Sequence, residues 1–361
     1  MQRSLLLPIL LTAFSLERSA IGQPAFLPNN SILQSLQSIT ASTTPANGDV
    51  NPYGVAFVPP NFPTGGSIAP NDVLVSNFNA SSNQEGTGTT IVSISPTGQQ
   101  SLFATSTLIG LDTALGVLSR GFVIAGNLPV AYPNKVPTPG QGSLQVFDKN
   151  GHLVTTFNDK NLLDSPWDLT INDQGSTAEV FVSNVLSGTV TRLNLSVTTT
   201  GVTLVSKTQI AAGFGHKLIP AIVAVGPTGL AYDRGRDTLF VASTADNKIF
   251  GISNAGGRSS AATPFLVFGD QTRLHGPLGL ALSANGNLIT ANGDGVNAGG
   301  TPNDLVEFTE QGTPVATYQL DGGNPGAAFG VAGTAGQFPI RFAAVDDDLN
   351  TITIWTLRSL I

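Results

Sequence analysis

Hydrophobic residues along the chain fall in short runs, separated by segments rich in Gly, Asn, Asp, Ser and Thr. Several runs alternate apolar and polar residues, for example residues 90–94, 189–193 and 351–355. Alternation with a period of two is the pattern of a half-buried strand, whereas an amphipathic helix repeats every 3.6 residues. The pattern therefore predicts an all-β protein with many turns.

One short motif recurs along the chain: proline, any residue, glycine, and then a small apolar strand. In the third copy Asp168 stands in place of the glycine, and in the second and sixth copies alanine replaces the proline. The spacing is near the period of about 50 residues that is typical of propeller blades. The six copies begin at Pro52, Ala114, Pro166, Pro227, Pro277 and Ala328.

Each copy of the motif is followed by a second and a third apolar run, and a fourth run is visible in the first, second, fourth and fifth units. Four strands per unit predict a six-bladed β-propeller of four-stranded blades over residues 45–361. The sixth unit lacks a fourth strand, and residues 32–39 alternate ahead of the first unit. We therefore predict that the N-terminal segment, residues 23–44, supplies the strand that closes the last blade and removes an open sheet edge.

The N-terminus has the features of a secretory signal peptide. Arg3 precedes an uncharged apolar stretch, residues 5–16, which is too short to span a bilayer. Ala20 and Gly22 place small residues before a cleavage point at Gln23. We expect a signal peptide over residues 1–22 and a secreted, periplasmic or cell-envelope protein. The alternative is a buried N-terminal helix, which Pro8 would interrupt. We expect no membrane span after cleavage, because no later run approaches about 18 apolar residues.

Composition excludes several classes of function. The net charge is −7, and the 16 Lys and Arg residues form no basic cluster, which disfavours a nucleic-acid partner. The absence of cysteine excludes disulfides, thiolate metal sites and cysteine nucleophiles. Neither Gly-x-Ser-x-Gly nor His-Glu-x-x-His occurs, so two common hydrolase motifs are missing.

Residues 226–251 (GPTGLAYDRGRDTLFVASTADNKIFG) carry the motif most clearly, and they resemble the NHL class of repeats. The resemblance covers about residues 50–357 and implies a six-bladed propeller, which identifies a fold better than a function. The chain is also distantly similar to gluconolactonase-like propellers, which hold a divalent metal on Glu, Asn and Asp. Their early Glu-Gly-Pro motif is absent here, and the Trp-Phe-Thr-Glu strand of streptogramin lyases has no counterpart.

Polar residues end the second strand of every predicted blade. In a propeller these positions share a face with the start of the first strand, near the central channel. Asn and Asp oxygens there could hold Ca²⁺ or another divalent cation, bind a ligand, or order water. Alternatively, each side chain satisfies backbone groups of its own turn. The column consists of Asn77, Asn127, Asn184, Ser243, Asn292 and Asp346.

Three further residues extend this candidate site. Asp168 is expected to point into the channel beside Asn184, with Trp167 and His275 at the rim. Long loops over residues 77–88, 127–142 and 292–303 border the same face, and such loops are often functional. We predict an exported scaffold that binds an unidentified ligand or protein partner at the channel mouth; the alternative is a metal-dependent hydrolase of the gluconolactonase type. The predicted ligand-binding residues are Asp168, Asn184, Asn127, Asn77, Asn292, Asp346, Trp167 and His275, and the predicted metal ligands are Asp168, Asn184 and Asp346.

Overall fold

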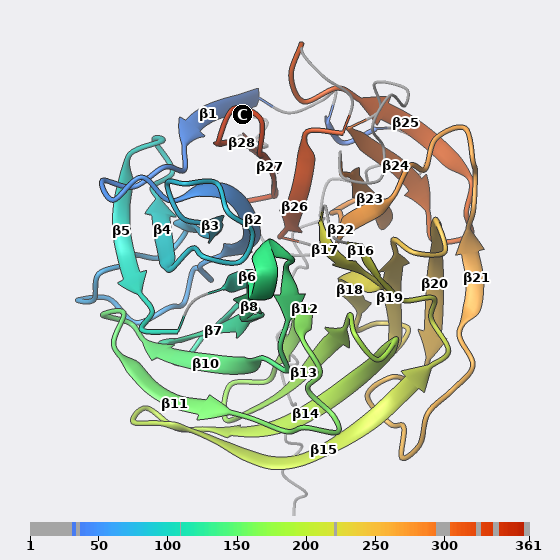
Figure 1. Cartoon of the computed structure of the whole chain (residues 1–361), viewed down its shortest axis with the longest axis horizontal. Coiled ribbons are helices and arrows are strands. Elements are labelled where there is room, and N and C mark those ends of the chain that lie inside the picture. The colour runs from blue at the N-terminus through green and yellow to red at the C-terminus, as the bar shows by residue number, and fades with distance from the viewer. Residues whose placement is uncertain are drawn as a thin grey trace, which may run out of the picture.

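Six four-stranded antiparallel sheets surround a central axis, as the computed structural model shows (Figure 1). This confirms the predicted all-β, six-bladed propeller. The structure describes residues 31–33, 37–108, 110–219, 222–293, 304–322, 326–334 and 339–356. The predicted signal peptide over residues 1–22 lies outside these ranges and stays a prediction. Among the described residues, no helix has the length and apolarity needed to cross a membrane.

In each blade the first strand lies next to the axis and the fourth forms the outer edge (Figure 1). Blades one to three consist of β2 (Val50–Phe57), β3 (Val73–Asn79), β4 (Thr90–Ile94), β5 (Gln100–Thr105); β6 (Leu111–Leu118), β7 (Phe122–Asn127), β10 (Ser143–Asp148), β11 (Leu153–Phe157); and β12 (Pro166–Asp173), β13 (Thr177–Asn184), β14 (Thr189–Val197), β15 (Val202–Ala212). Blades four and five consist of β18 (Pro227–Asp233), β19 (Thr238–Ser243), β20 (Lys248–Ser253), β21 (Phe265–Phe268); and β22 (Pro277–Leu282), β23 (Asn287–Asn292), β24 (Leu305–Thr309), β25 (Pro314–Tyr318).

Blade six combines the two ends of the described chain. β26 (Ala328–Gly333), β27 (Arg341–Asp346) and β28 (Thr351–Thr356) are completed by β1 (Gln37–Ser42), which pairs antiparallel with β28 from Gln37↔Thr356 to Ser42↔Thr351. The predicted closure is therefore confirmed, although the strand begins later than residue 32. Two small two-stranded sheets lie outside the six blades: β8 (Val130–Ala131) pairs with β9 (Thr138–Pro139), and β16 (Lys217–Ile219) pairs with β17 (Val223–Val225).

The residues just before β1 are fastened to blades five and six. Ile32 and Leu33 are buried in a cluster that includes Phe342 and Trp355 of blade six. The backbone N–H of Ile32 donates to the buried carboxylate of Glu307 in β24 (3.2 Å). Two asparagine amides, at positions 285 and 287, donate to the same carboxylate (3.0 and 2.8 Å). The N-terminal segment is thus held by strand pairing, by apolar burial and by a hydrogen bond to the buried side chain of Glu307.

The recurring motif forms a β-bulge at the start of the first strand of each blade. In blade one the register with β3 shifts between Pro52 and Val55, and equivalent shifts occur in the other five blades. A bulge redirects a side chain out of the regular alternation. The motif's third position is glycine because the next blade passes close by: a Cβ on Gly330 would lie 1.6 Å from the carbonyl oxygen of Tyr53.

Candidate functional site

The central channel contains two cavities, one at each face, with a narrow constriction between them. The cavity on the face where the first strands begin, called the upper cavity, has a volume of about 470 Å³. The lower cavity measures about 550 Å³ and is lined by apolar and polar residues at the ends of the first strands and in the turns that follow them. The upper cavity is lined by Val50, Asn51, Tyr53, Ser81, Asn83, Glu85, Trp167, Ile222, Ala224, Val225, Thr244, Leu278, Phe329, Asp347, Asp348 and Asn350.

The floor of the upper cavity is formed by the middle residue of the repeated motif in four blades. Tyr53, Trp167, Leu278 and Phe329 line both the upper cavity and the constriction. The ring of Tyr53 lies 5.7 Å from Trp167, nearly perpendicular to it, and 4.6 Å from Phe329. The bulge aims these side chains at the axis, where they narrow the channel. The upper cavity therefore ends on an apolar, mostly aromatic surface.

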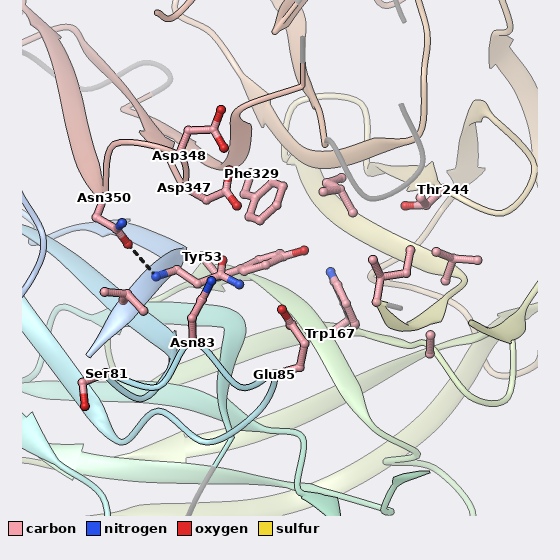
Figure 2. Close-up of a pocket in the computed structure, with 16 residues that line it drawn as sticks. Tyr53, Ser81, Asn83, Glu85, Trp167, Thr244, Phe329, Asp347, Asp348 and Asn350 are labelled. Atoms are coloured by element: carbon pink, nitrogen blue, oxygen red, sulfur yellow. Dashed lines mark hydrogen bonds between the residues drawn. The ribbon is translucent and has the colours of Figure 1, made fainter. Parts of the chain in front are cut away.

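The rim of the upper cavity is acidic and polar. Glu85 comes from the loop after β3, and Asp347 and Asp348 come from the turn between β27 and β28. The buried amide of Asn79 donates to Glu85 Oε1 (3.2 Å), and the Tyr132 hydroxyl donates to the Glu85 carbonyl (2.6 Å). Figure 2 shows the Glu85 carboxylate and the Tyr53 hydroxyl both directed toward the middle of the cavity, near Trp167. The loop is therefore organised to present Glu85.

Asn51 adds a constrained amide to the wall. Its φ of 57° lies in the left-handed region, which asparagine tolerates better than most residues. Its N–H donates to Asn350 Oδ1 (2.7 Å, dashed in Figure 2), which holds the backbone in place. The side chain is 8% exposed, and its carbonyl oxygen is buried with no hydrogen-bond partner. A buried acceptor without a donor is costly, so a ligand or water donor at this position would be favoured.

The asparagine column makes local hydrogen bonds instead of lining the upper cavity. Asn77 donates to the carbonyl of Thr43 (3.1 Å), and Asn184 Oδ1 accepts from the N–H of Asp164 (3.1 Å). In both cases the partner belongs to the loop that enters the same blade. Each amide thereby fastens an inter-blade connection to the second strand. Neither side chain lines the upper cavity, and each one bonds to a loop of its own blade.

The other predicted site residues have similar local roles. Asn292 Oδ1 accepts from the backbone N–H of His275 (3.1 Å), and its amide donates to the carbonyl of Arg273 (2.8 Å). Asn127 Oδ1 accepts from Ser143 (3.4 Å). Asp346 accepts from the N–H of Leu349 (2.9 Å), and burial raises its pKa to about 6. Of the predicted residues, Trp167 lines the upper cavity, and Asp168 lines the constriction and the lower cavity.

If Asn292 serves as a structural clamp, Asn292→Ala should lower the free energy of unfolding by about 1–2 kcal/mol, because two partly buried backbone groups lose their partners. Chemical denaturation measures this directly. Asn161→Ala, on an exposed loop, is the matched control and should change stability by less than about 0.5 kcal/mol. Equal stabilities for the two variants would contradict the clamp.

Asp168 occupies the glycine position of the motif in blade three and reaches the next blade. Its Oδ2 accepts from the N–H of Leu230 in blade four (2.9 Å), and its Oδ1 accepts from the N–H of Leu169 (2.7 Å). In blades four, five and six, where glycine stands at this position, the backbone of the next blade fills this space. The apolar surroundings favour the neutral acid, and burial raises the pKa of Asp168 to about 8. Asp168 therefore joins blades three and four while exposing a titratable group to the channel.

The predicted metal ligands are not brought together. Asp168 and Asn184 belong to blade three, whereas Asp346 belongs to blade six across the ring. Both carboxylate oxygens of Asp168 accept backbone N–H groups, and the amide of Asn184 is bonded within its own blade. Within the described ranges, no group of three or more His, Asp or Glu side chains is arranged to hold a metal ion. Calcium needs about six to eight converging oxygens, which these three residues do not supply.

Comparison with known proteins supports the fold and leaves the activity open. No family model matches the chain, and no curated protein matches its sequence. Among solved structures, a gluconolactonase from Xanthomonas campestris is 12% identical with a TM-score of 0.55, covering 93% of this chain and 99% of that chain.

Two other propellers match to a similar degree. The calcium-binding protein regucalcin from Agrobacterium tumefaciens is 12% identical, with a TM-score of 0.52 and coverage of 88% of this chain and 94% of that chain. Virginiamycin B lyase from Staphylococcus aureus is 13% identical, with a TM-score of 0.51 and coverage of 89% and 100%. These likenesses show that the chain has a β-propeller fold.

Proposed function

We propose that this chain is a ligand-binding propeller that takes a small organic molecule into its upper cavity. The observation that carries the proposal is the aromatic floor, formed by Tyr53, Trp167 and Phe329, beneath a rim of polar side chains. Ligand sites are usually concave, largely apolar and equipped with a few placed polar groups, with volumes of about 300–1,000 Å³. The upper cavity has this size and this division between floor and rim.

The two tryptophans of the chain allow a direct test. Trp167 lines the cavity, whereas Trp355 is 2% exposed in the core of blade six. A thermal-shift screen of small aromatic and aliphatic compounds should yield molecules that raise the melting temperature, because they bind the folded state alone. In the Trp355→Phe variant, where Trp167 is the remaining tryptophan, these compounds should change the fluorescence in a saturable way.

The Trp167→Phe variant is the matched control, because its remaining tryptophan lies away from the cavity. Its fluorescence should not respond to the same compounds, although the phenyl ring preserves an aromatic floor. Compounds that perturb Trp355 and leave Trp167 unchanged would place binding elsewhere and contradict the proposal. A screen without a single stabilising compound would also count against it.

The second candidate is a metal-dependent hydrolase, because similar folds include a gluconolactonase and a calcium-binding protein. The same screen separates the candidates when it includes calcium and a sugar lactone. Metal-dependent lactone hydrolysis, together with a rise in melting temperature on adding calcium, would favour the hydrolase. The ligand-binding proposal expects neither result, since the upper cavity ends on aromatic rings instead of oxygen ligands.

A further inference from the structure

The charged side chains around the upper cavity are of one sign. Glu85, Asp347 and Asp348 supply carboxylates, and among the described residues that line the cavity there is no Lys, Arg or His. The chain as a whole carries a net charge of −7. These carboxylates would repel an anionic ligand, whereas a positively charged ligand would be attracted into the channel.

The floor below these carboxylates suits the apolar surface of an organic cation. The rings of Tyr53 and Trp167 are nearly perpendicular, at 86° with centres 5.7 Å apart, and Phe329 lies 4.6 Å from Tyr53. Aromatic faces attract cations through the ring quadrupole, and cages of several rings recognise ammonium groups. A bare metal ion would gain little from this surface, because it needs oxygen ligands on several sides.

Asn51 provides an acceptor that is independent of the acidic residues. Its side chain lines the cavity, is more than nine-tenths buried, and has a carbonyl oxygen without a hydrogen-bond partner. The Asn350 side chain holds its backbone, so the amide is positioned before a ligand arrives. A donor group such as a protonated amine would satisfy this oxygen and remove the cost of leaving it unpaired.

We propose that the ligand of the upper cavity is an organic cation, a protonated amine or quaternary ammonium group attached to an apolar body. The aromatic floor takes the apolar body and the alkyl groups around the nitrogen, while Glu85 and the two aspartates of the rim balance the positive charge. This inference rests on the proposed function and narrows it to one class of ligand.

Calorimetric titration of the full chain with three compounds tests the inference. Benzylammonium, benzyl alcohol and phenylacetate share a phenyl ring and are positive, neutral and negative. The cation should bind at least about tenfold more tightly than the alcohol, through combined cation–π and carboxylate interactions. Phenylacetate should bind more weakly than the alcohol. Affinity for the cation should also fall as ionic strength rises, since the rim is exposed to solvent.

Glu85→Gln should weaken binding of the cation by about threefold to tenfold and leave binding of benzyl alcohol unchanged. The variant keeps a carbonyl oxygen that can accept from Asn79, so the loop retains this hydrogen bond. Asp173→Asn, in the lower cavity, is the matched control and should bind the cation like the wild type.

Equal affinity for the alcohol and the cation would overturn the charge preference while leaving a ligand-binding cavity in place. Binding of the cation that is unaffected by Glu85→Gln but lost in Asp173→Asn would assign it to the lower cavity and contradict the inference. If none of the three compounds binds the wild type at millimolar concentration, both the inference and the proposed function lose support.

Discussion

Deleting residues 31–42 should unfold the propeller or leave it aggregated, because this segment completes blade six. The deletion removes β1 from β28 and exposes the edge of that strand. It also removes the buried side chains of Ile32 and Leu33, each contributing about 1.5–3 kcal/mol. The combined loss is comparable with the whole stability of a typical protein, about 5–15 kcal/mol. Circular dichroism and size-exclusion chromatography of the purified variant measure the result.

Two further variants keep this prediction testable if the deletion variant cannot be purified. Glu307→Ala leaves the N–H of Ile32 and the amides of Asn285 and Asn287 without their shared acceptor, and should cost about 2–4 kcal/mol. Val205→Ser, at a 67% exposed position of an outer strand, should be nearly neutral. A deletion variant as stable as the wild type would show that closure by β1 contributes little.

The sequence predicted most of the architecture because every blade has to fit its first strand close to the axis and to the next blade. The bulged motif recurs wherever a first strand approaches the axis, and its glycine is required where the next blade passes within contact distance. The fourth strand of blade three, β15, was not predicted from the pattern. Its residues 203–209 are mostly exposed or half-buried and mix threonine, lysine and glutamine with apolar positions, so no clear alternation is visible.

The closing segment shows where alternation is ambiguous. Residues 32–39 alternate in sequence, yet Ile32 and Leu33 act as buried anchors and strand pairing begins at Gln37. A strand with one buried face and a loop with buried anchor residues both place apolar residues near polar ones. The alternation therefore does not show where strand pairing begins. The deciding partner is Glu307, which lies 275 positions away and was not visible as a contact in the sequence.

The candidate site was predicted in part. Trp167 was predicted at the rim of the channel mouth, whereas the structure places it in the floor of the upper cavity, because the bulge turns the motif's middle residue toward the axis. The middle position of the motif is also occupied by Tyr53, Leu278 and Phe329. The large residues at this position could therefore have predicted the floor of the upper cavity. The rim could not be found in this way, because loops that carry Glu85 and Asp348 follow no period.

The asparagine column illustrates why position in a repeat does not establish a binding role. Asn77, Asn184 and Asn292 occupy equivalent places, and each bonds to the loop that enters its own blade. A hydrogen bond that each blade needs for its own loop places the same residue type at the same position in every blade. A ring of ligand-binding residues would give the same pattern. Departures from the repeat are more informative, because they break a pattern that packing alone would preserve.

Asp168 is such a departure, and it should make the stability of the protein fall as pH rises. Burial raises the pKa of Asp168 to about 8, whereas an unfolded aspartate titrates near pH 4. The folded state therefore binds more protons between these values, so the free energy of unfolding decreases across this window, by up to about 1.4 kcal/mol per pH unit. Burial also raises the pKa of Glu310 to about 7 and that of Asp346 to about 6, which adds slope at lower pH.

Between pH 7 and pH 8 Asp168 contributes most of the slope, because Asp346 is almost fully ionised there and Glu310 completes most of its ionisation within the interval. Urea unfolding of the wild type should show falling stability over this interval, and Asp168→Asn should show a flatter profile. The variant loses one acceptor for the N–H groups of Leu169 and Leu230, so the slope, and not the absolute stability, is the quantity to compare. Glu310→Gln should retain most of the slope between pH 7 and pH 8 and lose a larger part of it near pH 6. Parallel profiles for the wild type and Asp168→Asn would mean that the carboxyl group is already ionised at neutral pH, and that the channel carries a fixed negative charge at its constriction.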